Sequence, residues 1–330
     1  MKILIAGGAG FIGSNFVYYF LEKHKEWDVV CLDKLTYAAN LHTLDQALQN
    51  PKFKFLKGDI ADKDSIFDVF HEENFDVVIN FAGESHVDKS IEDPSVFLTS
   101  NLIGTQVLMD ASRKFSVKRY HQVSTDEVYG DLPIDRPDLL FTEASVIQAS
   151  SPYAASKAAA DLLAQSYFRT YRFPVTISRC SNNYGPYQHL EKLIPAMIIR
   201  AQNNEMLPIY GDGINIRDWL HVYDHCTALD LILDQGVVGE VYNIGGNNER
   251  TNLHVVKMIL KELRKPEALI EYVEDRPGHD LRYAIDPTKM MNKFSWEPSI
   301  RFEEGIIETI RWYLNNQNWW KDMVGVLCDE

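Results

Sequence analysis

Short apolar runs rich in β-branched residues alternate with longer stretches of helical periodicity over residues 1–180. Runs of this length predict strands, and the longer stretches, in which apolar positions recur every three or four residues, predict helices. Their alternation predicts an α/β fold with a doubly wound parallel sheet that is covered by helices on both faces. The predicted strands are 2–6, 28–32, 53–56, 76–80, 119–123 and 174–178, and the predicted helices include 14–21, 62–71, 94–115 and 152–171.

The pattern changes after residue 180, where proline and tryptophan become more frequent and the predicted elements become shorter. The apolar run 241–244 still predicts a buried strand, so we expect part of this half to return and complete the sheet. We therefore expect two regions that share a large interface. The first is 1–180, completed by about 221–245, and the second, smaller one consists of 181–220 and 246–330.

A glycine-rich segment joins the first predicted strand to the first predicted helix. Its glycines allow the backbone to approach a pyrophosphate that rests on the N-terminus of the helix. Asp33, twenty residues after Gly13, ends the second predicted strand, where an acidic side chain binds a ribose 2′-hydroxyl and repels a 2′-phosphate. The sequence therefore predicts a Rossmann-type domain that prefers NAD to NADP. The motif residues expected to hold this cofactor are Gly7, Gly10, Phe11, Ile12, Gly13 and Asp33.

Other polar motifs also follow predicted strands directly. In an open parallel sheet, ligands bind beyond the carboxyl ends of the strands, so we expect these motifs to meet in one crevice. The segments that lie at such ends are 7–13, 59–60, 82–86, 124–127 and 181–183.

Tyr153 and Lys157 lie four residues apart, which places both side chains on one face of the predicted helix 152–171. Pro152 suits the first turn of this helix, and Ser150 or Ser151 can cap it. A nearby lysine ammonium group and a positive nicotinamide ring together favour the phenolate form of a tyrosine. We therefore expect Tyr153, with a lowered pKa, to remove the proton from a sugar hydroxyl as hydride leaves its carbon.

Thr125, Asp126 and Glu127 follow the fifth predicted strand. A simple dehydrogenase has no use for two adjacent carboxyl groups, whereas an elimination needs one acid and one base. Neighbouring residues on a strand point to opposite faces, so both groups reach one substrate only if the chain leaves the sheet at Thr125. Mutual repulsion can keep Asp126 protonated while Glu127 is ionised. The predicted chemistry is oxidation coupled to elimination.

The bulk composition fits a globular enzyme of 330 residues with 45% hydrophobic and 24% charged residues. A net charge of −14 argues against nucleic acid or an anionic membrane as the main partner. We also expect no signal peptide, because glycines interrupt the apolar N-terminus, and no membrane span. The spacing of Cys31, Cys180, Cys226 and Cys328 indicates neither disulfides nor zinc, which favours a cytoplasmic location.

Motifs along nearly the whole chain resemble those of the extended short-chain dehydrogenase/reductase family, in its branch of nucleotide-sugar 4,6-dehydratases. The motifs are GGAGFIG at 7–13, DKLTYA at 33–38, ESHVD at 84–88, STDEVYG at 124–130, SNNYGPYQ at 181–188, YGDG at 210–213, RDW at 217–219 and DRPGHD at 275–280. The resemblance implies NAD as cofactor and dTDP-glucose as substrate.

The resemblance also implies a three-step cycle. NAD takes hydride from sugar carbon 4 while Tyr153 acts as base and Thr125 binds the reacting hydroxyl. Glu127 then removes the proton from carbon 5 while Asp126 protonates the departing hydroxyl on carbon 6. Return of the hydride to carbon 6 and of a proton from Glu127 to carbon 5 gives a 4-keto-6-deoxy sugar.

Further binding residues are implied by the same resemblance. Arg217 and Arg276 are the better physical candidates for a diphosphate, since guanidinium groups bind phosphate oxygens in pairs. His86 and His279 are expected to form hydrogen bonds rather than to bind a metal. The additional cofactor residues are Lys34, Thr36, Asp59, Ile60, Ala82, Ser100, Tyr153, Lys157 and Asn183. The substrate residues are Ser85, His86, Thr125, Asn182, Lys192, Leu193, Pro208, Tyr210, Arg217, Asn252, Arg276 and His279.

Two alternative functions remain at this point. A nucleotide-sugar 4-epimerase shares the cofactor motif, Tyr153 and Lys157, but has no need for Asp126 and Glu127. A catalytically silent NAD-binding regulator has no need to retain Tyr153 or Lys157. Physical argument alone does not distinguish thymine from uracil, or glucose from a related sugar.

Apolar or alanine-rich faces on 94–115 and 152–171 predict a homodimer in which these helices pair across a two-fold axis. The tryptophans of the C-terminal part, Trp296, Trp312, Trp319 and Trp320, are expected in the core or in an interface. The apolar residues assigned to the dimer faces are Phe97, Leu98, Leu102, Ile103, Val107, Leu108 and 158–160.

Overall fold

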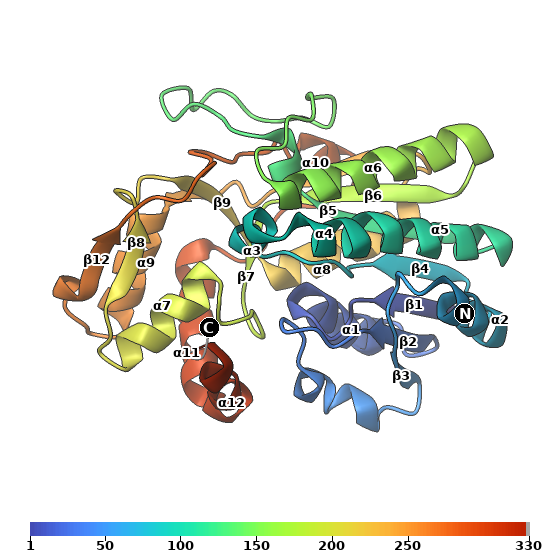
Figure 1. Cartoon of the computed structure of the whole chain (residues 1–330), viewed down its shortest axis with the longest axis horizontal. Coiled ribbons are helices and arrows are strands. Elements are labelled where there is room, and N and C mark those ends of the chain that lie inside the picture. The colour runs from blue at the N-terminus through green and yellow to red at the C-terminus, as the bar shows by residue number, and fades with distance from the viewer. Residues whose placement is uncertain (328–330) are drawn as a thin grey trace.

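A computed structural model describes residues 1–327 and contains a central sheet of seven parallel strands in the order β10-β6-β5-β4-β1-β2-β3 (Figure 1). The doubly wound α/β fold predicted from the sequence is therefore confirmed. Cys328 lies outside the described residues. The strands are β1 (Lys2–Ala6), β2 (Asp28–Asp33), β3 (Phe53–Lys57), β4 (Val77–Asn80), β5 (Arg119–Thr125), β6 (Val175–Cys180) and β10 (Val241–Ile244).

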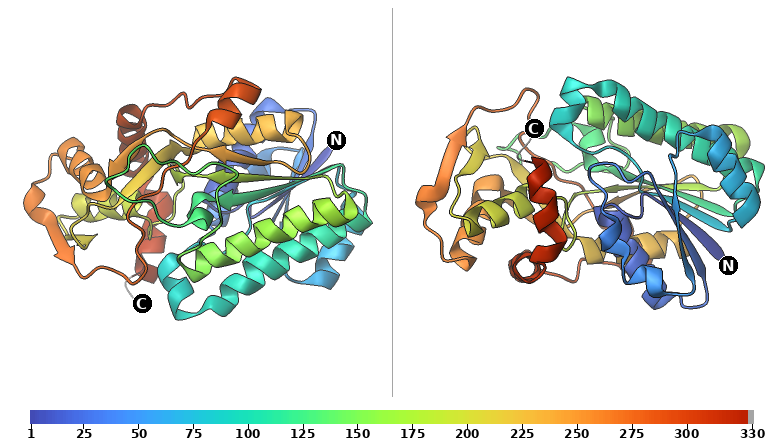
Figure 2. Two further views of the ribbon diagram at one scale, coloured as in Figure 1. Left: turned by 90° about the horizontal axis from the view of Figure 1, so that it is seen from above. Right: turned by 60° about the horizontal axis from the view of Figure 1, so that its bottom comes forward.

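Both faces of the sheet are buried, because successive side chains of a strand point to opposite sides. On β1, Ile3 and Ile5 enter one apolar core, and Leu4 and Ala6 enter the other. Figure 2 shows the sheet between these two layers of helices. The first layer contains α1 (Phe11–Lys23) and α8 (Val222–Gln235), and the second contains α2 (Lys63–Glu73), α5 (Gly104–Lys114) and α6 (Pro152–Tyr171).

The predicted helix 94–115 is not one regular helix. After α3 (Val87–Glu92) it consists of α4 (Pro94–Phe97), a π-helical turn at Leu98–Ile103, and α5. In the π-turn Asn101 is buried, its Oδ1 accepts from the Glu84 amide at 2.8 Å, and its Nδ2 donates to the Glu84 carbonyl at 3.0 Å. The wider turn thus places an amide side chain against the segment that follows β4, which apolar periodicity could not predict.

The apolar faces predicted for a dimer are largely internal. Phe97, Val107 and Leu108 are buried within the chain, as are Ala158 and Ala160, and Leu102 is half-buried. Leu98 and Ile103 are exposed, because they point away from the sheet. The prediction that all these residues form a contact surface is therefore wrong for the buried ones.

The α6 helix begins and ends as its sequence predicts. Ser151 is the N-cap, and its side chain accepts a hydrogen bond from the Ala154 amide at 3.1 Å. Pro152 occupies the first turn, and Arg172 ends the helix in the left-handed conformation, with a φ of 54°.

A second region lies beyond the carboxyl ends of the strands, at the left of Figure 1. It contains a three-stranded sheet in the order β11-β9-β7, a two-stranded sheet of β12 and β8, and a separate apolar core. Its strands are β7 (Asn182–Tyr184), β8 (Leu207–Tyr210), β9 (Ile216–His221), β11 (Glu249–Thr251) and β12 (Ile270–Val273). Its helices are α7 (Leu193–Gln202), α9 (Asn252–Glu262), α11 (Phe302–Asn315) and α12 (Gln317–Leu327).

One helix of the C-terminal part packs on the first region instead. Met290 of α10 (Thr288–Phe294) and the nearby Trp296 are buried in the core that α1 and α8 share with the large sheet. The 246–330 segment therefore contributes to both apolar cores.

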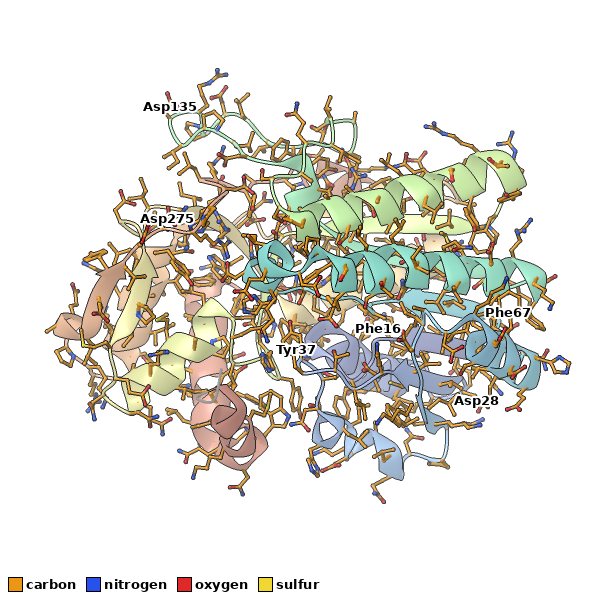
Figure 3. All side chains as sticks on the ribbon, viewed as in Figure 1. Phe16, Asp28, Tyr37, Phe67, Asp135 and Asp275 are labelled. Carbon is orange, nitrogen blue, oxygen red and sulfur yellow. The ribbon has the colours of Figure 1, made fainter. Side chains whose placement is uncertain are left out.

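A long loop connects the turn after β5 with α6. Figure 3 shows Asp135 at its outer tip. Arg282 is buried and holds the part of this loop that follows Asp135, because its guanidinium donates to the carbonyl groups of Arg136 and Leu139 at 3.2 and 3.0 Å. Among the described residues, we find no helix with the length and apolar character that crossing a membrane requires.

Candidate active site

The glycine turn after β1 forms a cradle that only glycine permits. Gly7 has a φ of 78°, and a Cβ at this position would lie 2.4 Å from the Ala82 amide nitrogen. A Cβ at Gly13 would lie 2.2 Å from the Gly7 carbonyl oxygen. These contacts keep the backbone of α1, whose N-cap is Gly10, close to the ends of β1 and β4. The exposed amides of this helix start are suited to a phosphate group.

Asp33 borders the cavity beside this cradle. One Asp33 carboxylate oxygen accepts from the Ala9 amide at 2.9 Å and the other from the Leu35 amide at 2.8 Å. Burial raises the pKa of Asp33, and the two amide hydrogen bonds act in the opposite direction. Nine predicted cofactor residues line the cavity: Gly7, Gly10, Asp33, Lys34, Thr36, Asp59, Ile60, Ala82 and Ser100. The cradle, the acidic group and the cavity fit an adenine dinucleotide with a free ribose 2′-hydroxyl.

The chain leaves the sheet at Thr125, as two adjacent catalytic carboxyl groups require. A 3-10 turn over Asp126–Tyr129 follows β5 directly. Thr125 caps this turn, since its Oγ1 accepts from the Glu127 amide at 3.2 Å, and it also donates to Asp126 Oδ1 at 3.3 Å. One threonine side chain therefore fixes the positions of both acidic residues.

The two carboxyl groups differ in their surroundings. Asp126 is 2% exposed, and its Oδ2 has no hydrogen-bond partner among the described residues. Burial, followed by the charge of Glu127, raises the pKa of Asp126 well above its ordinary value. Burial also raises the pKa of Glu127, but Arg217, Lys192 and Arg276 oppose this rise. The surrounding charges therefore favour a protonated Asp126 next to an ionised Glu127.

Tyr153 and Lys157 lie on the face of α6 that turns toward β5. Interaction with the Thr125 side chain favours the ionised form of Tyr153, and Lys157 Nζ donates to the Val123 carbonyl at 2.7 Å. In the chain alone, the pKa of Tyr153 is not lowered as predicted. Burial and the charge of Glu127 raise the pKa of Tyr153, and burial lowers the pKa of Lys157.

A fully buried ion pair lies one turn further along α6. Asp161 Oδ2 accepts from Arg179 Nε at 2.8 Å, and the two side chains are 0% and 2% exposed. Burial raises the pKa of Asp161, although Arg179 lowers it. Asp161 lies four residues after Lys157, and this spacing already indicates that both side chains share one face of the helix.

The predicted phosphate ligands are held in different ways. Arg217 is buried, donates to the Asp280 carbonyl at 2.9 Å and lies over the ring of Tyr283. Arg276 pairs with Asp88 at 3.3 Å. Lys192 Nζ donates to the Ser85 carbonyl at 2.8 Å. The charges of all three cations lower the pKa of Glu127, so cations from different parts of the chain act on the turn after β5.

The remaining predicted substrate residues come from several different elements. Tyr210 is 43% exposed and contacts only the edge of His279 among the aromatic rings, so it is not a core residue. His279 pairs with Asp275 at 2.6 Å, and His86 with Glu191 at 3.6 Å. Asn182 begins β7, Asn252 begins α9, Leu193 begins α7 and Pro208 lies in β8.

Asn183, which we predicted to bind the cofactor, does not line the cavity beside the glycine cradle. Its Oδ1 pairs with His225 Nδ1 at 2.9 Å, and its Nδ2 donates to the Ser181 carbonyl at 2.9 Å. These contacts hold the amide against α8.

Sequence reasoning missed several polar residues of the site. Glu84 lines the cofactor cavity, and Glu191 lies between His86 and His189. Burial opposes ionisation of Glu191, but His189, Lys192 and His86 lower its pKa to about 2. Both residues adjoin predicted ones, so their positions were available as a signal. Tyr283 near Glu127 had no comparable signal.

Comparisons with known proteins agree with this geometry. Residues 4–309 match the family described as GDP-mannose 4,6 dehydratase. The dTDP-glucose 4,6-dehydratase of Escherichia coli is 47% identical, over 97% of this chain and 96% of that protein. A crystal structure of the Bacillus anthracis dTDP-glucose 4,6-dehydratase in complex with NAD has a TM-score of 0.91 and 48% identity, over 98% of this chain and 99% of that one. The Streptomyces venezuelae enzyme, also with NAD bound, gives a TM-score of 0.94 and 42% identity, over 98% and 100%.

Proposed function

The chain belongs to the GDP-mannose 4,6 dehydratase family, and on that premise we infer that it is an NAD-dependent hydro-lyase that converts dTDP-glucose to dTDP-4-keto-6-deoxy-glucose. The family model is described by GDP-mannose, whereas the relatives that match over nearly the whole chain are dTDP-glucose enzymes. We therefore infer the substrate, dTDP-glucose, from these relatives.

One observation carries the reaction type. Asp126 and Glu127 lie on the same turn after β5, and the charges of both raise the pKa of Tyr153, so an acid, a base and a phenol lie within electrostatic range of one another. A 4-epimerase needs only the phenol and the cofactor. The two additional carboxyl groups therefore favour loss of water over epimerisation.

We assign Tyr153 as the base that accepts the proton of the carbon 4 hydroxyl, while Thr125 orients that oxygen. When bound, oxidised NAD supplies the hydride acceptor and a positive ring that favours the Tyr153 phenolate. Burial raises the pKa of Tyr153 in the chain alone, so the phenolate requires this additional positive charge.

Glu127 is assigned as the base that removes the carbon 5 proton, which the neighbouring ketone makes acidic. Arg217, Lys192 and Arg276 favour its ionised form. Asp126 is assigned as the acid that protonates the leaving hydroxyl of carbon 6, since deep burial beside Glu127 keeps it neutral. Loss of this hydroxyl as water completes the elimination.

The same three cations are proposed to bind the substrate diphosphate. The net charge of the chain is −14, so an anionic substrate needs a local group of positive charges. Arg217 already contacts Asp280 and Tyr283, which holds its guanidinium in a fixed orientation.

The test is turnover of a panel of nucleotide sugars, read by the loss of one water in the mass of the product. We expect dTDP-glucose to give a 4-keto product that absorbs strongly in alkali, and UDP- or GDP-sugars to react more slowly. The double variant Asp126→Asn with Glu127→Gln should accumulate reduced cofactor and stop before water loss. An ordinary dehydration rate in this variant, or epimerised product of unchanged mass, contradicts the assignment.

We further propose that the protein works as a cytoplasmic homodimer. Exposed apolar side chains gather on the outer faces of the helices that cover one side of the sheet, and they include Ile91, Val96, Leu98, Ile103 and Leu162. Pairing of two copies through the segment 91–103 and α6 would bury these residues. Elution at monomer mass across micromolar concentrations would contradict the dimer.

A further inference from the structure

Trp319 connects the C-terminal helix α12 to the loop that follows β2. Its indole Nε1 donates to Thr43 Oγ1 at 2.9 Å. The Tyr18 hydroxyl of α1 donates to the Thr43 carbonyl at 2.6 Å. Thr43 is buried, so this residue joins helices from opposite ends of the sequence.

The other face of this loop forms a wall of the cofactor cavity. Thr36, Ala38 and Ala39 line the cavity, and the Asn40 amide donates to the Ala9 carbonyl in the glycine turn at 3.3 Å. Thr43 follows Asn40 by three residues, and its amide donates to the Asn40 carbonyl at 3.0 Å. Movement of the loop at Thr43 would therefore be transmitted to the wall of the cavity.

Trp319 is itself held by the aromatic core of the second region. Its ring contacts those of Trp312 and Tyr187 at centroid distances of 5.2 and 5.5 Å, and Tyr187 stacks on Tyr18 at 6.2 Å. The hydrogen bond to Thr43 thus joins the substrate-side core to the cofactor-side loop.

We propose that Trp319 and Thr43 form a latch that retains NAD through the catalytic cycle. The proposal rests on the proposed function, in which the same cofactor molecule must oxidise the sugar and later reduce it. If the cofactor leaves between these steps, the oxidised sugar cannot be completed. Trp319 is a positioning residue, because it acts on the cofactor only through the loop 36–43.

The experiment measures exchange of bound NAD in the intact holoenzyme, by mixing it with excess isotopically labelled NAD and following the label on the protein. Trp319→Phe keeps an aromatic ring and removes the donor, and Thr43→Val removes the acceptor. We expect either change to accelerate exchange about fivefold, the size of effect that loss of one hydrogen bond commonly produces. The double variant should be no faster than either single variant, because both remove the same bond.

The chain provides a matched control in Trp296. Its Nε1 also donates to a threonine, Thr227 Oγ1, at 2.9 Å, but it lies under α8 and does not line the cofactor cavity. Trp296→Phe should lower the melting temperature as much as Trp319→Phe and leave NAD exchange unchanged.

Exchange within twofold of wild type in both Trp319→Phe and Thr43→Val would overturn the latch. Equal acceleration by Trp296→Phe would also overturn it, because loss of general stability would then explain the effect. The readout needs no turnover, so it stays interpretable if the substrate assignment fails. During turnover, the Trp319→Phe protein should release more 4-keto sugar that still carries its carbon 6 hydroxyl.

Discussion

Asp126 on the turn after β5 and Asp161 on α6 are both buried carboxyl groups, and they differ in their partners. Asp161 forms an ion pair with Arg179 at 2.8 Å. Asp126 accepts a hydrogen bond from the neutral Thr125 hydroxyl instead of from a cation, and in both residues the second carboxyl oxygen has no hydrogen-bond partner among the described residues. Isolated buried charge is very unfavourable, so the paired group can remain ionised, whereas the unpaired one is held neutral.

On the proposed function, this difference separates a structural acid from the acid that protonates the leaving group. Burial raises the pKa of both carboxyl groups, but for Asp161 the charge of Arg179 opposes the rise. For Asp126 the charges with the largest effect are those of Glu127 and Asp218, which add to the rise, and the weaker effect of Arg217 opposes it. Burial alone therefore does not distinguish a neutral carboxyl group, which can donate a proton, from an ionised structural carboxylate. The sign of the neighbouring charge does distinguish them.

Asp126→Asn should produce the largest effect, on rate and not on stability. Removal of a general acid commonly slows a reaction by 10²–10⁴-fold, and we expect about a thousandfold lower rate of dehydration. The free energy of unfolding should be unchanged or slightly higher, since a neutral amide replaces an unpaired acid. Single-turnover formation of the 4-keto product and urea titration measure the two quantities. A destabilised but active variant would remove the distinction between the two acids.

Arg179→Met should give the opposite pattern. It leaves Asp161 buried without its partner, which should reduce the free energy of unfolding by about 3 kcal/mol. Arg179→Met combined with Asp161→Leu should regain much of that loss, because no unpaired charge remains. Urea titrations of wild type, single and double variants provide the measurement. If the double variant is no more stable than Arg179→Met, the loss comes from packing and not from charge.

A smaller effect is expected in the pH dependence of stability. The folded pKa of Asp126 is raised, so the folded chain binds this proton more tightly than the unfolded chain. Stability should therefore fall as pH rises from the ordinary value of 3.8 through the folded pKa. Asp126→Asn lacks this ionisation, so its unfolding free energy relative to wild type should increase with pH. Parallel curves for the two proteins over this window would contradict the raised pKa.

The smallest effect is expected at the helix cap beside the site. Ser151→Ala removes the hydrogen bond to the Ala154 amide and should cost about 1 kcal/mol of stability. Tyr153 lies only two residues later, so the rate should fall a few fold at most if the cap serves folding alone. Ser151→Asn, which retains a cap, is the control. A loss of rate as large as that of Asp126→Asn would place Ser151 in the catalytic group.

The features predictable from the sequence are those that depend on local pattern. The glycine spacing, Asp33 and the catalytic turn each follow an apolar run directly, so the sheet brings them to one edge. The π-turn around Asn101 was not predictable, because its shape depends on contacts with Glu84. The hydrogen bond from Trp319 to Thr43 was equally unpredictable, since 276 residues separate them in the sequence.

The hydrogen-bond partner of the Lys157 ammonium group also could not be predicted from the sequence. Spacing placed it beside Tyr153, but only the fold shows that its ammonium donates to the Val123 carbonyl. Periodicity likewise predicted an apolar face over 94–115 but not that Phe97, Val107 and Leu108 point inward. Side-chain direction depends on tertiary packing, which pattern alone does not determine.

Tyr153, Lys157 and Asp161 recur every four residues on the single helix α6. Because a helix has 3.6 residues per turn and rises 1.5 Å per residue, these groups descend about 12 Å and rotate by about 80° from first to last. The single helix α6 thus connects Tyr153 to the ion pair of Asp161 with Arg179. A designed shift of α6 along its axis to reposition the Tyr153 phenol would therefore also break the buried ion pair of Asp161 with Arg179.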